Sequence, residues 1–297
     1  MPSRRQPARS SGQRARASRR SSISATLVVV AICLVIGLLA VKLAGKQPSP
    51  RPTECLAGPG NQAVQLSVSQ AGIAATIAGV ANHRGMPVRA VAIAYATALQ
   101  ESKLANLRYG TMDSVGVFQQ RPSQGWGTAQ QIENPVYATD RFFAALAQVP
   151  RYRRLPIYQA AQDVQRSADG SAYAQYSEVG TEMARAFTGT QPREVWCSYG
   201  SPVGKARLTA ARSALDGAFG GQGSAQQGDP AGRVSVSVNS AREGWAVAAW
   251  LVSHAARYGI SDVRYAGFQW LASSSGRWKP VTAAKRGPAA TAAVVFG

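Results

Sequence analysis

The chain has 297 residues, which is enough for one or two domains with an adequate hydrophobic core. It carries 33 Lys and Arg against 14 Asp and Glu, a formal charge of +19. The first 53 positions hold ten of the basic residues and no acid, so the remainder has 23 basic and 14 acidic residues, or +9. Since no nucleic-acid-binding motif accompanies this charge, we expect partners among anionic polymers or lipids and no nucleic acid.

The N-terminal part predicts a membrane anchor. Residues 1–22 are rich in Arg and Ser and almost lack apolar side chains, which predicts a disordered arm. Ile23–Val41 is an apolar run without a charge, just long enough at ~1.5 Å per residue to cross a ~30 Å hydrocarbon layer. Seven Arg precede it, so we expect a single-pass protein of the cell membrane with one transmembrane helix over residues 23–42, a cytoplasmic N-terminus and an extracytoplasmic bulk. A cleaved signal peptide is the alternative, but no good Ala-x-Ala site follows the run.

The next part of the chain predicts a mainly helical domain. Residues 43–65 contain a Pro-rich stretch typical of an extended extracytoplasmic spacer. Residues 66–214 contain apolar residues at helical spacing, broken by Gly and Pro. The segment from Leu104 to Arg121 is expected to be loop and short hairpin. Helices are expected over Ser69–Arg84, Val88–Ser102, a segment starting at Asn134-Pro135, Ile157–Ser167 and Ser177–Phe187.

The C-terminal part has a different pattern. Residues 215–233 are rich in Gly and Gln, which predicts a flexible linker. Residues 234–297 predict a small α/β module with a helix over Ala241–Tyr258, ended by Gly259. Its strands are expected over Val234–Val238, Val263–Tyr265, Phe268–Leu271 and Ala292–Phe296.

One short pattern points to chemistry. An apolar, Ala-rich segment ends in Glu101-Ser102, and Gly116-Val117-Phe118-Gln119 follows after a turn. Because apolar surroundings disfavour a charged carboxyl group, a Glu in this position can keep a proton and donate it to a glycosidic oxygen. The pattern resembles the Glu-Ser … Gly-Leu-Met-Gln motif of soluble lytic transglycosylases in the lysozyme-like superfamily. The wider segment Gly85–Leu146 resembles lysozyme-like proteins of actinobacterial envelopes.

The resemblance implies a fold class and an activity. The fold would be a mainly α lysozyme-like domain (α+β), preceded by the transmembrane helix and followed by the small α/β module. The protein would be a membrane-anchored, extracytoplasmic enzyme that acts on peptidoglycan glycan strands. Glu101 would act as acid and then as base at the β-1,4 bond between N-acetylmuramic acid and N-acetylglucosamine. The positive charge also fits attraction to anionic wall polymers.

Several other residues become candidates for the site. In a transglycosylase the 6-hydroxyl of the sugar attacks, so no second carboxylate is required, whereas a hydrolase would use a partner acid. Asp113 is the first candidate for that acid, followed by Glu133 and Asp140. Asp before Ser is also a natural turn residue. Ser114, Gln119 and Gln120 would line the glycan cleft, and Gln119 matches the Gln of the family. Trp126, between two glycines, would stack on a sugar ring or cover the domain surface.

One departure from the family leaves a second function open. Lytic transglycosylases carry Ala-Tyr-Asn-Ala-Gly further along the chain, where this sequence reads Ala160-Ala161-Gln162-Asp163-Val164-Gln165. Gln162 could replace the amide, but the aromatic residue and the glycine are missing. The alternative is therefore a non-catalytic, glycan-binding envelope adaptor with a degenerate lysozyme-like domain.

Cysteine and histidine usage limits other chemistry. Cys33 lies inside the apolar run, while Cys55 and Cys197 lie beyond it and are predicted to form a disulfide around most of the first domain. Two unpaired thiols are the alternative. His83 and His254 lie far apart, and with three dispersed cysteines they form no zinc pattern, so we expect no metal and no cofactor.

Overall fold

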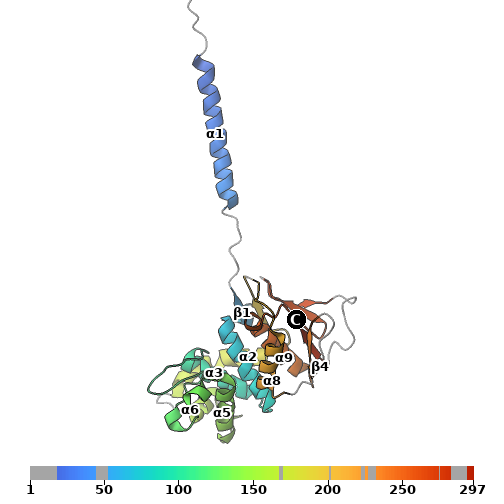
Figure 1. Cartoon of the computed structure of the whole chain (residues 1–297). Coiled ribbons are helices and arrows are strands. Elements are labelled where there is room, and N and C mark those ends of the chain that lie inside the picture. The colour runs from blue at the N-terminus through green and yellow to red at the C-terminus, as the bar shows by residue number, and fades with distance from the viewer. Residues whose placement is uncertain are drawn as a thin grey trace, which may run out of the picture. The chain divides into compact units, whose positions relative to one another are not determined.

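The computed structural model describes residues 19–44, 53–166, 170–200, 202–221, 225–226, 232–273, 275–281 and 293–297. The chain divides into two units, residues 1–49 and residues 50–297. Within its described residues the first unit consists of helix α1 (Arg19–Ala44), and the second holds the other helices and the strands (Figure 1). Most of the predicted disordered arm and parts of the spacer and the linker lie outside the described residues.

Helix α1 contains residues 23–42, for which a membrane anchor was predicted. Among the residues that the structure describes, we find no helix with the length and apolar character needed to cross a membrane. The predicted transmembrane helix is therefore wrong. So are the fold class that included it and the single-pass membrane location with a cytoplasmic N-terminus and an extracytoplasmic bulk.

The second unit is mainly helical with two small antiparallel sheets. Its helices are α2 (Val68–His83), α3 (Val88–Ser102), α4 (Ala129–Ile132), α5 (Pro135–Gln148), α6 (Ile157–Gln165), α7 (Ser177–Phe187), α8 (Leu208–Phe219), α9 (Ala241–Ser253) and α10 (Ala255–Tyr258), with the 3₁₀-helices η1 (Gly60–Gln62), η2 (Pro122–Gln124) and η3 (Gly170–Tyr176). The first sheet has the order β2-β1-β3, with β1 (Glu54–Ala57), β2 (Val64–Leu66) and β3 (Val195–Ser198). The second has the order β4-β5-β9-β6-β7-β8, with β4 (Ala225–Gln226), β5 (Val234–Ser237), β6 (Asp262–Tyr265), β7 (Phe268–Leu271), β8 (Lys279–Pro280) and β9 (Ala293–Phe296).

Helix α2 lies at the centre of this unit and packs against α5, α8 and α9 (Figure 1). It begins with a capping box, in which Gln70 N donates to Ser67 Oγ at 3.2 Å and Ser67 N donates to Gln70 Oε1 at 2.9 Å. It ends before Gly85, whose φ of 62° suits glycine. Residues 71–81 of α2 are all buried, most of them Ala, Gly, Ile or Val. Small side chains all round the helix let neighbouring helices approach it on every side, so α2 forms the middle of the core.

The first sheet contains the predicted disulfide. Strands β1 and β3 are antiparallel and place Cys55 opposite Cys197. The two sulfurs are bonded, and both residues are fully buried. The prediction of this disulfide is confirmed. The bond closes a loop of 142 residues that includes α2 to α7.

The second sheet is built from the C-terminal segment. The strands expected near residues 234, 263, 268 and 292 are confirmed as β5, β6, β7 and β9, and β9 lies between β5 and β6. Trp270 Nε1 donates to Cys197 O at 3.1 Å, and Trp278 Nε1 donates to Val195 O at 2.8 Å. These bonds tie the second sheet to strand β3 of the first.

Helix α8 extends into the segment expected to be linker. It continues to Phe219, while the linker was expected to begin at residue 215. Leu215, Ala218 and Phe219 are buried, and only Gly217 of this turn is exposed. The apolar spacing of three to four residues therefore outweighed the local Gly content.

Candidate functional site

Glu101 lies in the last turn of α3. The helix follows Pro87 and stops at Lys103, whose φ of 55° is left-handed. Nearly all of its residues from Ala90 to Ala98 are without exposed surface, so the helix axis is fixed by packing. The end of α3 emerges from this core and leaves Glu101 half-buried.

Two donors fix one oxygen of the Glu101 carboxylate. The hydroxyl of Tyr173 in η3 donates to Glu101 Oε1 at 2.6 Å. The amide Nε2 of Gln165, at the end of α6, donates to the same oxygen at 3.2 Å and to Phe118 O at 2.8 Å. Tyr173 is 1% exposed, so it is held rigidly in the domain. Two successive elements, α6 and η3, therefore meet the carboxylate of a residue that lies more than 60 positions earlier in the chain.

The other oxygen, Glu101 Oε2, is free for chemistry. It accepts no hydrogen bond from the residues that the structure describes, and it is not one of the buried atoms without a partner. It is therefore open to the surface. A carboxyl group with one oxygen held and the other open is suited to exchange a proton with a bound ligand.

Ser102 joins the two halves of the sequence motif. It is 6% exposed, and its hydroxyl contacts Val117 O at 2.7 Å and Ala98 O at 3.1 Å, while Ala105 N donates to it at 3.2 Å. Phe118, the next residue after Val117, stacks on Phe142 of α5 with ring centroids 4.5 Å apart. The Glu-Ser pair and the Gly-x-Phe-Gln segment are therefore one structural piece.

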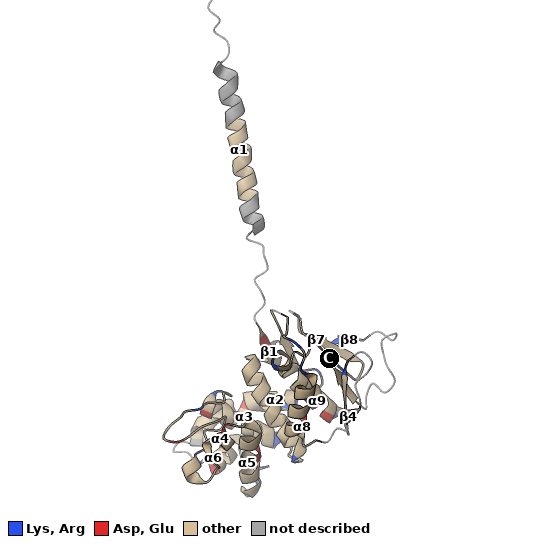
Figure 2. Ribbon diagram, in the orientation of Figure 1, with Lys and Arg blue, Asp and Glu red and all other residues tan. Residues whose placement is uncertain are grey.

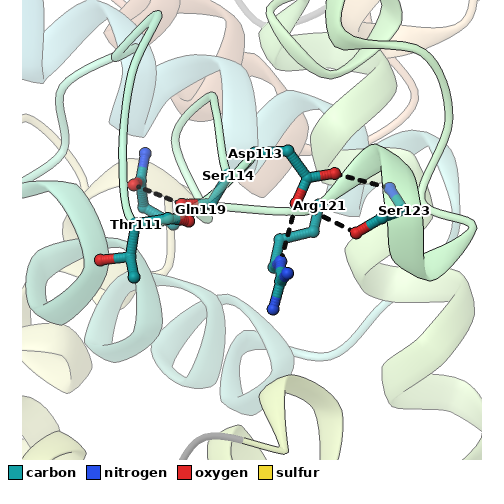
Figure 3. A network of polar contacts seen from close by, with 6 residues as sticks. All are labelled: Thr111, Asp113, Ser114, Gln119, Arg121 and Ser123. Carbon is teal, nitrogen blue, oxygen red and sulfur yellow. Dashed lines mark hydrogen bonds and ion pairs between the residues drawn. The ribbon is translucent and has the colours of Figure 1, made fainter.

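Ser114 and Gln119 hold the loop between α3 and η2. Ser114 Oγ lies 2.8 Å from Thr111 O and 3.1 Å from Gln119 Oε1, and Gln119 Nε2 donates to Gly116 O at 3.1 Å. Figure 3 shows the Ser114 and Gln119 side chains facing each other. Gln119 has a φ of 48°, a backbone position that non-glycine residues seldom adopt. The structure thus brings these two predicted residues together, with their polar groups turned to the loop.

Asp113 points the other way in Figure 3, toward Arg121 and Ser123. Its carboxylate pairs with Arg121 Nε at 2.8 Å and accepts from Ser123 N at 2.8 Å and Ser123 Oγ at 3.0 Å. The Arg121 guanidinium, followed by the Ser123 amide and hydroxyl, holds the pKa of Asp113 well below its ordinary value. Asp113 is therefore a charged group with its oxygens engaged in closing the loop onto η2.

The other predicted contacts are dispersed. Gln120 is 2% exposed and donates through Nε2 to Ala138 O of α5 at 3.2 Å, which leaves it no surface for a glycan. Gln162 on α6 lines a small pocket of about 280 Å³ with Tyr158 and Ser171. Trp126 is half-buried in a larger groove of about 1080 Å³.

Glu101 does not line this groove, and its link to the groove is the side chain of Gln165. Gln165, which donates to Glu101, lines the groove together with Trp126, and α5 and α6 form its walls. Among the described residues, no three His, Cys, Asp or Glu side chains lie close enough to hold a metal ion. What the site offers is a carboxyl group, amide donors and one indole.

Two residues of the site escaped the sequence analysis. One is Tyr173 of the 3₁₀-helix η3, whose hydroxyl donates to Glu101, and the other is Gln165. Gln165 had a usable signal, because it lies four residues after buried Ala161 and so continues the buried face of α6. Tyr173 had none, since its position depends on how η3 folds back on α3.

Comparison with known proteins adds no assignment. No family model matches the sequence, and none of the curated proteins is significantly similar to it.

Proposed function

We propose that this protein cleaves peptidoglycan glycan strands as a lytic transglycosylase of the lysozyme-like type, with Glu101 as acid and base. The observation that carries the proposal is the carboxylate of Glu101, held through Oε1 by Tyr173 and Gln165 and open at Oε2. The groove beside Gln165 offers room for a sugar chain.

The proposed reaction balances with a single carboxyl group. Protonated Glu101 gives its proton to the glycosidic oxygen between N-acetylmuramic acid and N-acetylglucosamine, and the C1–O bond breaks. The 6-hydroxyl of the muramic acid then bonds to C1, and its proton returns to Glu101. The products are a 1,6-anhydro end and a free hydroxyl on the leaving sugar.

The state of Asp113 favours this route over hydrolysis. A glycoside hydrolase normally uses a second carboxylate as nucleophile or as base for water. Asp113 already engages Arg121 and Ser123 with both of its oxygens. We therefore assign Asp113 to the support of the loop.

Digestion of purified peptidoglycan by the full chain tests the proposal, with products identified by mass spectrometry. We expect anhydro-muropeptides, and a rate lower by roughly 10²–10⁴-fold for Glu101→Gln, the usual scale of general acid catalysis. Glu178→Gln, in the exposed first turn of α7, is the matched control and should cleave at the parent rate. Products with reducing ends would show that the reaction is a hydrolysis and not a transglycosylation. Glycan binding without products from a folded parent would instead support the adaptor.

A further inference from the structure

Five arginines gather around the groove beside Gln165. They lie on α5, in the turn that follows it, and at the C-terminal cap of α6. Arg141 and Arg166 line the groove itself. The other three line an adjoining pocket of about 410 Å³ that shares residues 148–150 with the groove; they are Arg151, Arg153 and Arg154.

These arginines lack acidic partners. All five are exposed, and within the described part of the chain none forms an ion pair. The single acid that lines either cavity is Asp163, so the two linings carry a net charge of +4. Elsewhere in the unit basic residues do have carboxylate partners, as in the pairs of Arg84 with Asp140 and Arg121 with Asp113. Figure 2 shows both signs of charge spread over the helices and strands of this unit.

A cluster of arginines without acidic partners is suited to bind an anionic ligand. Like charges repel over distances up to a Debye length of ~8 Å at physiological salt, so an anionic ligand relieves the repulsion. The guanidinium group pairs with carboxylate and phosphate through two parallel hydrogen bonds. In the same groove Trp126 offers an indole, and Gln124 and Gln148 offer amides, groups that suit the faces and hydroxyls of sugars.

We infer that the groove binds a glycan strand bearing anionic groups, carboxylates or phosphates, which the five arginines recognise. The inference rests on the proposed function, because it places the glycan in the groove lined by Gln165, whose amide donates to Glu101. It adds the charge of the substrate and the residues that select it. Arg141 and Arg166 would contact the strand nearest Gln165, and the arginines of the adjoining pocket would contact its continuation.

The test is a binding titration with the full chain carrying Glu101→Gln, so that no turnover occurs. The probes share one backbone: chitohexaose, its 6-carboxyl form and its 6-phosphate form. We expect the charged forms to bind at least tenfold more tightly than chitohexaose at 50 mM salt, with a smaller difference at 300 mM. A preference for the carboxyl or the phosphate form identifies the anionic group. Equal affinity for all three probes would overturn the inference.

Removing the arginines should remove the preference. In Arg141→Gln/Arg151→Gln/Arg154→Gln, no replaced side chain has a hydrogen bond or ion pair in the described structure, so the fold should persist, as the thermal midpoint will show. We expect the charged probes to lose about tenfold in affinity and chitohexaose to lose less than twofold.

The matched control changes the net charge by the same amount elsewhere. It is Lys205→Gln/Arg242→Gln/Lys279→Gln, three exposed positions outside both cavities. It should keep the parent affinities within twofold. Equal losses in both triple variants would show that total charge alone attracts the probes, and would refute the arginine site. If duplex DNA bound as tightly as the charged glycans and depended on the same arginines, the claim that the ligand is a glycan would be refuted.

Failure of this inference can be told from failure of the proposed function. Selective binding of charged probes without cleavage of any wall would refute the proposed enzymatic activity and support the arginine site. Cleavage by the parent with equal affinity for all probes would support the enzymatic activity and refute the arginine site.

Discussion

At the scale of single residues, the carboxylate of Glu101 depends on a hydroxyl from another segment. The bond from Tyr173 is short, at 2.6 Å, and its donor is buried. A hydrogen bond to a charged group contributes about 1.5–3 kcal/mol. We expect Tyr173→Phe to lower kcat about tenfold to a hundredfold with KM nearly unchanged, since the hydroxyl orients the acid and does not line the groove.

A neighbouring tyrosine provides the control for that experiment. Tyr176 lies in the same 3₁₀-helix, but its hydroxyl receives a hydrogen bond from Lys103 and not from the site. Tyr176→Phe should therefore keep kcat within twofold of the parent in steady-state assays on glycan oligomers. If Tyr173→Phe raised KM and left kcat intact, the orienting role would be wrong.

The ion pair of Asp113 should make the stability of the fold depend on pH. Arg121 and Ser123 hold its folded-state pKa well below the ordinary value of about 3.9 in unfolded chains. A depressed pKa in the folded state adds stability that is fully present above the unfolded value and is lost as the pH falls below it. Asp113→Asn should thus lower the Tm at pH 7, and the difference from the parent should shrink steadily below about pH 4.

Circular dichroism melts between pH 2 and pH 7 would measure this difference. Asp163→Asn removes an exposed carboxylate that has no ion pair within the described part of the chain, and it should follow the parent curve. A difference between Asp113→Asn and the parent that was constant over the whole range would contradict the linkage, because a merely steric effect does not titrate.

At the scale of elements, the approach of α7 to α3 sets the position of Glu101. Gly180 of α7 is buried, and a Cβ added there would lie 2.9 Å from Ala92 O and 3.2 Å from Ala96 N, both backbone atoms of α3. Overpacking of this kind costs about 1–3 kcal/mol, against a gain of at most about 1 kcal/mol from replacing Gly by Ala in a helix. We expect Gly180→Ala to lower the free energy of unfolding by about 1 kcal/mol in urea titrations.

Gly217→Ala is the matched control for that change. Gly217 lies in α8, is exposed, and an added Cβ would have no atom within 4 Å. It should raise the free energy of unfolding by about 0.4–1 kcal/mol through the unfolded chain. The two substitutions are the same in chemistry and should differ in sign. A stabilising Gly180→Ala would mean that α7 and α3 are not held at this distance.

The elements also show what local sequence can predict. The helices expected over Ser69–Arg84 and Val88–Ser102 are confirmed as α2 and α3, because their breaks at Gly85 and Pro87 are local signals. The extent of α8 could not be read in this way, since the burial of Phe219 comes from tertiary contact with α2: its ring would lie 2.8 Å from a Cβ on Gly79. The membrane anchor was predicted from the length of an uncharged apolar run and the arginines before it, and the described helix does not support it.

Some contacts of the candidate site could be predicted from local sequence and others could not. Glu101, Ser102 and Phe118 could be paired from sequence, because only a short loop separates them and Ser102 bonds to Val117 O. The donors to Glu101 come from α6 and η3, more than 60 residues further along. Such contacts depend on how α6 and η3 pack against α3, which no local pattern specifies. Whether Glu101 is catalytic stays a prediction.

At the scale of the whole molecule, the disulfide links the first and third strands around most of the helical part. In the chain-entropy treatment, a closed loop of 142 residues raises the free energy of unfolding by at most about 5 kcal/mol. All of the site elements α3, α6 and η3 lie inside this loop. We expect Cys55→Ala/Cys197→Ala to lower the free energy of unfolding by about 2–5 kcal/mol in guanidinium titrations. The parent should lose the same amount when a reductant is added.

The double variant also supplies the control, because reductant should not shift its midpoint, although Cys33 remains. The predicted loss should extend to the site, since Tyr173 and Gln165 reach Glu101 only while η3 and α6 are packed on α3. Cleavage by the double variant should therefore fail at a lower temperature than cleavage by the parent, in step with its unfolding curve. If activity persisted above that unfolding transition, the site would be independent of the loop that the disulfide closes.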